Sequence, residues 1–476
     1  MQKMVVAAVV AALVVPGVAS AAEPESTVTW GACPANVAPL GLECGTVKVP
    51  LDHAKPKGQK IEISISRLAS KKPEKRRGVL LTNPGGPGGE GMTFPFALKA
   101  LGLPQDVQDA YDVIGIDPRG VGNSTPVTCD LTQEQKLKGN VPPYAVTQAD
   151  VTKWAEESRK IANQCATSRT AWMLPHVSTA NAARDMDQIR QALKEPKASF
   201  LGYSYGTHLG AVYATLFPNR TDRVVLDSSL PAKGWDVEGG RGFGRGVEDR
   251  FPDFAKWVAA RPEYGLGTTP QQVRDKFFDL AARLDQKPVP GIDGPMFRFL
   301  TFAFIYGDRT FPTLAEYWQA LDTGKPLPEE EPAPDPDNAI SSRLYTVCND
   351  SRWPTSVSTY QRNVAIDRVR YPMFGAAAAN IQPCAFWPDP EERPISVGDR
   401  GPANVMIAQN DRDPATPLTG AQDMRRALGK RAVMVSADQG GHGAYVLAPN
   451  KCLNGAVTSF LLDGKRPAHD LRCAAE

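Results

Sequence analysis

The chain has 476 residues, a formal net charge of +2, and 42% hydrophobic against 22% charged residues. Basic residues are scattered apart from a short loop at residues 71–77, so the composition excludes a nucleic-acid-binding protein. About 455 residues remain once a leader is removed, enough for one large core with insertions or for two domains.

The first residues have the pattern of a signal peptide. Lys3 supplies positive charge, residues 4–15 are apolar, and Ala19-Ser20-Ala21 fits a small-x-small cleavage site. The apolar run is too short to span a bilayer comfortably, and no later segment is apolar for long enough. We expect residues 1–21 to be cleaved near Ala21 or Ala22, giving a secreted, extracellular protein without a membrane partner. An uncleaved anchor is the alternative.

The eight cysteines are consistent with export, because their number is even and none has CxxC metal or redox spacing. Each cysteine has a neighbour along the chain in one plausible local region. We therefore predict disulfides between sequence neighbours: Cys33–Cys44, Cys129–Cys165, Cys348–Cys384 and Cys452–Cys473.

Strand and helix patterns alternate along the first half of the chain, which predicts a mostly parallel α/β sheet. Residues 60–68 alternate apolar and polar side chains, as in an outer strand. The next predicted elements, in chain order, are strands at 78–82 and 111–117, a helix at 179–193, a strand ending at Ser204, a helix to Pro218 and a strand at 223–227.

The rhythm changes after residue 230. Residues 231–395 contain helical stretches, one of them starting well at Thr269-Pro270, and a Pro- and Glu-rich loop at 325–338. Strand patterns return at 403–408 and 431–436. We expect a core built from residues 22–230 and 396–476, interrupted by a mainly helical cap at 231–395.

A Gly-x-Ser-x-Gly motif, Gly202-Tyr203-Ser204-Tyr205-Gly206, lies between a predicted strand and a predicted helix. A sharp turn there would lift the Ser204 hydroxyl out of the fold, beside a base and backbone amides. The motif alone is weak evidence for a hydrolase, since it also occurs in loops by chance.

A serine nucleophile needs a base and a carboxylate that orients it, and in α/β-hydrolases the chain order is Ser, acid, His. His53 and His176 precede Ser204, and His208 lies one turn beyond it on the same helix. Of the two later histidines, His469 lies in the tail, whereas His442 lies in a glycine-rich turn after a strand. We therefore predict His442 as the base.

The acid should follow the strand at 403–408. Asp413 is followed by Pro414-Ala415-Thr416-Pro417, which would hold its turn rigidly, and Asp411 is the alternative.

Two backbone amides are needed to stabilise an oxyanion. We predict the amide of Tyr205, directly after the nucleophile, and that of Gly86, in the turn Pro84-Gly85-Gly86-Pro87-Gly88-Gly89 after the strand at 78–82. A merely tight turn is the alternative. Because Gly-Lys-Ser/Thr is absent, a phosphate-binding loop fits poorly.

Together these motifs resemble the secreted actinobacterial tripeptidyl aminopeptidases (prolyl tri/tetrapeptidyl aminopeptidase-like) of the proline-iminopeptidase-type α/β-hydrolase family. The resemblance covers about residues 30–475 and rests on Asn83-Pro84-Gly85-Gly86-Pro87-Gly88, Asp117-Pro118-Arg119-Gly120-Val121-Gly122-Asn123-Ser124, the Ser204 motif, Asp413 to Pro417 and Gly441-His442-Gly443. It implies a Ser-His-Asp exopeptidase that needs no metal or cofactor and releases short peptides, tripeptides or tetrapeptides, from a free N-terminus. Some members of this family prefer proline before the cut bond. We expect a monomer.

Exopeptidase action also requires a group that binds the free amine, and a carboxylate would do so. Asp350, beside Cys348, is the first candidate, with Glu90 and Glu238 as rivals; each is equally consistent with a surface carboxylate. Glu90 departs from the small polar residue that relatives often carry. The competing functions are a secreted esterase or lipase with the same triad, and a non-catalytic hydrolase-like binding protein.

Overall fold

The computed structural model describes residues 27–137, 141–328 and 335–476, so the predicted signal peptide lies outside the described residues. The described strands form one sheet in the order β1-β2-β3-β5-β4-β6-β7-β8-β9-β10. All pairs from β5 to β10 are parallel, and β1, β2 and β3 add an antiparallel edge. The strands are β1 (Thr29–Gly31), β2 (Glu43–Pro50), β3 (Lys60–Leu68), β4 (Gly78–Asn83), β5 (Tyr111–Ile116), β6 (Ala198–Tyr203), β7 (Thr221–Asp227), β8 (Val405–Arg412), β9 (Ala432–Gly440) and β10 (Leu471–Cys473).

Helices cover both faces of this sheet, as the apolar runs of its parallel strands require. One face of the sheet is covered by α1 (Phe94–Ala100), α2 (Gln105–Ala110) and α15 (Lys451–Asp463). The opposite face is covered by α5 (Thr179–Ala192), α6 (Tyr205–Leu216) and α14 (Leu418–Leu428). This is the α/β-hydrolase fold that the sequence predicts.

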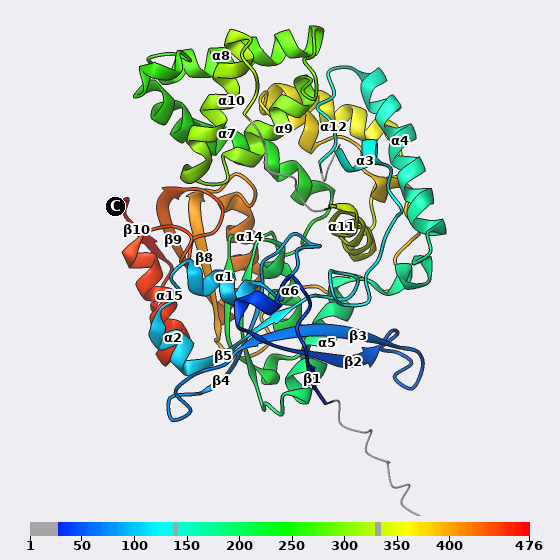
Figure 1. Ribbon diagram of the computed structural model, residues 1–476, viewed down its shortest axis with the longest axis vertical. Helices are drawn as coiled ribbons and strands as arrows, with labels where there is room; N and C mark the ends of the chain where they lie inside the picture. Colours follow the sequence, from blue (N-terminus) through cyan, green and yellow to red (C-terminus); the bar gives the residue numbers. More distant parts are fainter. Residues whose placement is uncertain (1–26, 138–140, 329–334) are drawn as a thin grey trace, which may run out of the picture.

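A second, helical layer lies over one end of the sheet (Figure 1). It has its own aromatic core, which includes Phe251, Phe254, Phe277 and Trp318. Its helices are α7 (Val237–Ala259), α8 (Pro270–Gln286), α9 (Gly294–Phe304), α10 (Phe311–Thr323), α11 (Asp337–Asp350), α12 (Val357–Arg370) and α13 (Gly375–Ala378). Thr269 caps α8 and Pro270 is its first residue, as predicted.

One helix of this layer comes from the first core segment of the sequence-based division. After α3 (Gln133–Leu137), the helix α4 (Gln148–Thr167) packs its Val151 and Ala155 against Tyr360 and Val364 of α12. A complete capping box at Thr147 and Asp150 starts α4. The cap is therefore assembled from two separate parts of the chain.

All four predicted disulfides are present. Cys33 is bonded to Cys44, Cys129 to Cys165, Cys348 to Cys384, and Cys452 to Cys473. Cys129–Cys165 ties α4 to the loop after β5, and Cys348–Cys384 fastens the end of α11. Among the described residues, no helix combines the length and the apolar character needed to cross a membrane.

Candidate active site

Ser204 occupies a strained turn between β6 and α6. Its backbone has φ 56° and ψ −123°, a conformation that a non-glycine residue rarely adopts. The turn is so tight that a Cβ added to Gly202 would lie 2.5 Å from the carbonyl oxygen of Gly206. The Ser204 amide donates to the carbonyl of Asp227 on the neighbouring strand at 2.9 Å. This geometry presents the hydroxyl at the carboxyl end of the sheet.

The loop after β4 lies directly against this serine. Gly85 has φ +101°, and a Cβ there would lie 2.8 Å from Ser204 Cβ and 2.6 Å from the carbonyl oxygen of Tyr203. Gly86 is exposed, and its amide donates to no group in the described part of the chain. Tyr205 begins α6, so its amide has no acceptor within the helix. Both predicted oxyanion donors are thus free to bind a ligand oxygen.

The turn after β8 holds a fully buried carboxylate, Asp413, against His442. His442 Nδ1 lies 2.9 Å from Asp413 Oδ2. The same carboxylate accepts from the amides of Ala415 and Thr416 and from the Thr416 hydroxyl, at 2.8 to 2.9 Å. Asp411, the alternative acid, instead forms an ion pair with Arg472 at 2.7 Å.

The environment of His442 favours its protonated form. Burial alone would lower the pKa of His442, but the charge and hydrogen bond of Asp413, with a contribution from Asp227, raise this pKa above its usual 6.5. Its side chain keeps 15% exposure. With Nδ1 donating to Asp413, Nε2 is available to accept a proton.

Two residues that sequence reasoning missed hold the histidine loop. The carboxylate of Asp227 accepts from the amides of Ala444 and Tyr445 at 2.8 and 2.7 Å, while its carbonyl binds the Ser204 amide. Burial raises the pKa of Asp227 to about 7. The carbonyl of Tyr306, from the cap, accepts from the His442 amide at 2.7 Å. The position of Asp227 at the end of a predicted strand was the one available signal.

Ser204 Oγ makes no hydrogen bond within the described residues. Catalytic hydrogen bonds are often long before substrate binds, so this does not exclude the residue as nucleophile. The other four histidines lie elsewhere: His53 contacts Asp185 at 2.8 Å, His176 is half-buried, His208 is buried, and His469 is exposed.

The three candidate amine-binding carboxylates differ in their partners. Asp350 accepts from both the amide and the hydroxyl of Thr179, and burial raises its pKa to about 6. Glu238 forms an ion pair with Arg241 at 2.9 Å. Glu90 is exposed, next to the oxyanion loop, and accepts one hydrogen bond from Asn36 at 3.1 Å.

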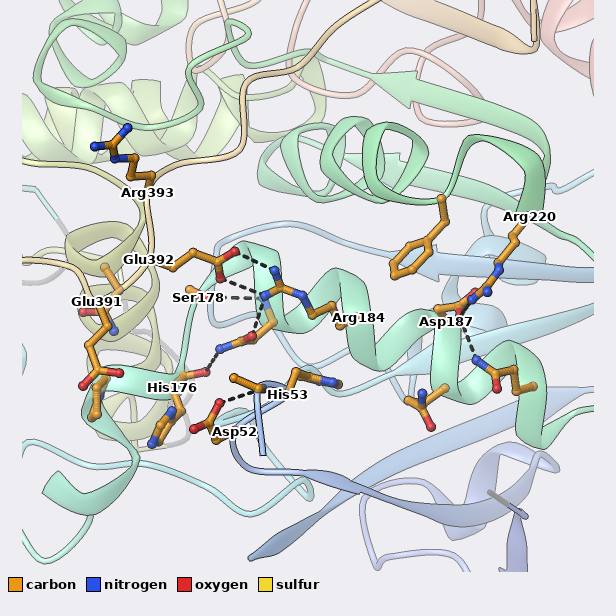
Figure 2. A pocket seen from close by; sticks show the side chains of 17 residues that line it. Asp52, His53, His176, Ser178, Arg184, Asp187, Arg220, Glu391, Glu392 and Arg393 are labelled. Carbon is orange, nitrogen blue, oxygen red and sulfur yellow. Dashed lines mark hydrogen bonds and ion pairs between the residues drawn. The ribbon is translucent and has the colours of Figure 1, made fainter. Parts of the chain in front are cut away.

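A separate polar cavity of about 750 Å³ lies beside α5, and its walls include none of the three triad residues (Figure 2). Two of the charged pairs on its wall are Arg184 with Glu392 at 2.5 Å, and Asp187 with its neighbour Arg190 at 2.9 Å. Among the described residues no group of three His, Cys, Asp or Glu side chains is arranged to hold a metal ion.

The chain is similar to proteins that carry the names of peptidases and of an esterase. Residues 371–473 match the family model described as TAP-like protein. The chain is 34% identical to the tripeptidyl aminopeptidase of Streptomyces lividans, over 96% of this chain and 88% of that protein. It is 28% identical to serine protease Hip1 of Mycobacterium tuberculosis H37Rv, over 97% and 94%, and 30% identical to carboxylesterase B of the same strain, over 94% and 90%.

Proposed function

The chain belongs to the family of the tripeptidyl aminopeptidases, and on that premise we propose that it is a secreted exopeptidase that releases tripeptides, or tetrapeptides, from free N-termini. It is a hydrolase of the serine peptidase class. The observation that carries the proposal is the hydrogen-bonded pair Asp413–His442. Asp227 connects the loop of His442 to the strained Ser204 turn, because its carboxylate accepts from the Ala444 amide and its carbonyl accepts from the Ser204 amide. The four disulfides support secretion.

In the proposed reaction Ser204 Oγ attacks the scissile carbonyl while His442 Nε2 takes the hydroxyl proton. Asp413 holds the imidazole and stabilises its charged form. The oxyanion that develops is bound by the amides of Gly86 and Tyr205. His442 then returns the proton to the leaving amine, and water, activated by the same imidazole, releases the peptide from the acyl-enzyme.

Of the three candidate carboxylates, Glu90 is the best placed to bind the substrate amine. Both oxygens of Asp350 accept from Thr179, and Glu238 is held by Arg241, whereas Glu90 has only the Asn36 amide as a hydrogen-bond partner in the described residues. A carboxylate that binds an ammonium contributes about 1.5–3 kcal/mol. We expect Glu90→Gln to lower kcat/KM on free-amine substrates by roughly 10- to 100-fold, with Glu238→Gln as the matched control.

The function is tested with the mature protein on a proline-ended tripeptide p-nitroanilide that has a free or an acetylated amine. We expect cleavage of the free-amine peptide, little cleavage of the acetylated one, and a loss of at least about 10³-fold in Ser204→Ala. Equal cleavage of both peptides would contradict exopeptidase action, and full activity of Ser204→Ala would contradict the mechanism.

A secreted esterase is the second candidate, because a relative of similar identity carries the name carboxylesterase B. The same triad hydrolyses esters, so the comparison must be made on matched substrates. A tripeptide ester and the corresponding anilide, each with free and acetylated amines, separate the two functions. An esterase would cleave acetylated and simple acyl esters as well as the free-amine peptide.

A further inference from the structure

Arg343, on α11, is a buried charge without a counter-charge. Its exposed fraction is 3%, it makes no hydrogen bond within the described residues, and its Nε is fully enclosed without an acceptor. Buried arginines are normally paired, as Arg119, Arg250 and Arg298 are here with Asp185, Asp253 and Asp285. An enclosed cation with no partner marks a place where a ligand can supply one.

Arg343 lies close to the proposed catalytic groups. Its guanidinium carbon is 4.4 Å from the centroid of the Trp235 ring, and its charge acts on the Tyr306 phenol. The Tyr306 ring lies 5.0 Å from the imidazole of His442. One turn earlier on α11, the backbone lies against the oxyanion loop, since a Cβ at Gly88 would lie 2.3 Å from the carbonyl oxygen of Ala339. Arg343 therefore lies on a helix that contacts the oxyanion loop and is near Tyr306, whose ring contacts His442.

Two neighbouring polar groups also lack partners. Trp235 Nε1 is enclosed next to Gly240 and has no acceptor. Tyr306 is half-buried, and its hydroxyl makes no hydrogen bond to any described residue. Burial raises the pKa of Tyr306 well above its usual range, so the phenol stays a neutral donor. Burial lowers the pKa of Arg343 to about 10, so the guanidinium remains charged at neutral pH. The charged guanidinium of Arg343 and the neutral hydroxyl of Tyr306 favour a ligand with oxygen acceptors and a negative charge.

The small cavity beside Arg343 does not provide the missing negative charge. It has a volume of about 30 Å³ and is bordered by Gln135, Trp154 and Gln382. This is room for about one water molecule, which hydrates a cation without neutralising it.

We propose that Arg343, with Trp235 and Tyr306, forms a binding site for a carboxylate of the peptide substrate. The proposal rests on the proposed peptidase function and adds a charge preference to it. The site is distinct from the amine site, because an unpaired guanidinium repels an ammonium. The carboxylate can come from an acidic side chain or from the C-terminus of a short peptide.

The test measures peptide binding by calorimetry to the intact Ser204→Ala protein, which does not turn substrate over. One arm compares tripeptide amides that carry Glu or Gln at each position in turn. The other compares tetrapeptides that end in a free carboxylate or an amide. We expect one carboxylate-bearing peptide to bind at least about tenfold tighter than its neutral partner, which identifies the source of the carboxylate.

Variants at Arg343 then assign the preference to this side chain. Arg343→Met in the same background should make the dissociation constants of the acidic and neutral peptides equal, and Arg343→Lys should retain part of the difference. Arg298→Met is the matched control, because Arg298 also stacks on a ring, that of Tyr144 at 4.2 Å, but is paired with Asp285. It should leave the preference unchanged.

Equal binding of acidic and neutral peptides by the Ser204→Ala protein would overturn the proposal, as would a preference that survives Arg343→Met. If Arg343→Met does not fold, a preference that is undiminished in Arg343→Lys would overturn the proposal as well. If neutral free-amine peptides still bind in any of these outcomes, the proposed peptidase function stands although the carboxylate site does not. Failure of every peptide to bind would contradict that function and this proposal together.

Discussion

The proton affinity of His442 depends mainly on its neighbour Asp413. Burial lowers the pKa of His442 and Asp413 reverses this effect. Because the free enzyme needs a neutral imidazole, kcat/KM should rise with pH through a midpoint above 6.5. Asp413→Asn removes the charge, so we expect the midpoint to fall below the wild-type value and kcat to drop by about 10⁴-fold.

The measurement is the pH profile of kcat/KM on the tripeptide p-nitroanilide. Asp411→Asn is the matched control, since Asp411 lies two residues before Asp413 and its carboxylate pairs instead with Arg472 of β10. It should change neither the midpoint nor the rate appreciably. An unchanged midpoint in Asp413→Asn would remove Asp413 from the role assigned to it.

The site residues that could be predicted from the sequence are those that lie in a recognisable local motif. Ser204 lies in a strand-turn-helix pattern, and Asp413 and His442 each follow a strand in the order that the chemistry requires. Tyr306 and Arg343 have no such motif. Tyr306 acts through its carbonyl, and Arg343 is notable only because the fold buries it without an acid.

A buried histidine on α6 should make the stability of the protein depend on pH. His208 is buried, its Nδ1 has no partner, and a Cβ at Gly234 would lie 2.6 Å from its Nε2. Burial lowers the pKa of His208 to about 4. Between pH 6.5 and about 4 the unfolded chain therefore binds a proton that the folded chain does not, so stability falls as the pH is lowered through this window.

We expect this one group to cost about 3 kcal/mol of unfolding free energy across that window. The measurement compares urea denaturation of the wild-type protein and His208→Asn at pH 7 and at pH 4.5. The variant should lose less stability on acidification. His469→Asn, at an exposed position, is the control, and an identical acid sensitivity of wild type and His208→Asn would contradict the assignment.

Central elements were predictable and peripheral ones were not. The strand predicted at residues 60–68 is β3, and those at 78–82 and 111–117 match β4 and β5 to within a residue at their ends. The short strands β1 and β10 carry too few side chains to show a period, and neither was predicted. The association of α4 with the cap also escaped prediction, because it is fixed by contacts between segments about 200 residues apart.

At the scale of the molecule, the cap contacts the acid, histidine and oxyanion loops of the proposed site. A Cβ at Gly246 of α7 would lie 2.1 Å from the carbonyl oxygen of Pro414, beside Asp413. Arg412, at the end of β8, forms an ion pair with Asp253 of α7 at 2.9 Å. Asn338 of α11 donates to the carbonyls of Gly120 and Val127 at 2.9 and 2.8 Å. Substrate binding should therefore be sensitive to how firmly α11 is held.

The disulfide Cys348–Cys384 tests this coupling, because it fastens α11 across 36 residues. Cys452–Cys473 closes 21 residues at the far end of the core and serves as the matched control. Loss of either bond should lower the free energy of unfolding by about 3–4 kcal/mol.

With Cys348 and Cys384 both replaced by serine, we also expect KM for tripeptide substrates to rise several-fold, since α11 carries Arg343 and supports the oxyanion loop at Gly88. The double serine variant at Cys452 and Cys473 should unfold at lower temperature with an unchanged KM. Thermal unfolding and steady-state kinetics on both variants give the answer, and an equal rise in KM in the two would show that global stability, rather than the position of α11, controls substrate binding.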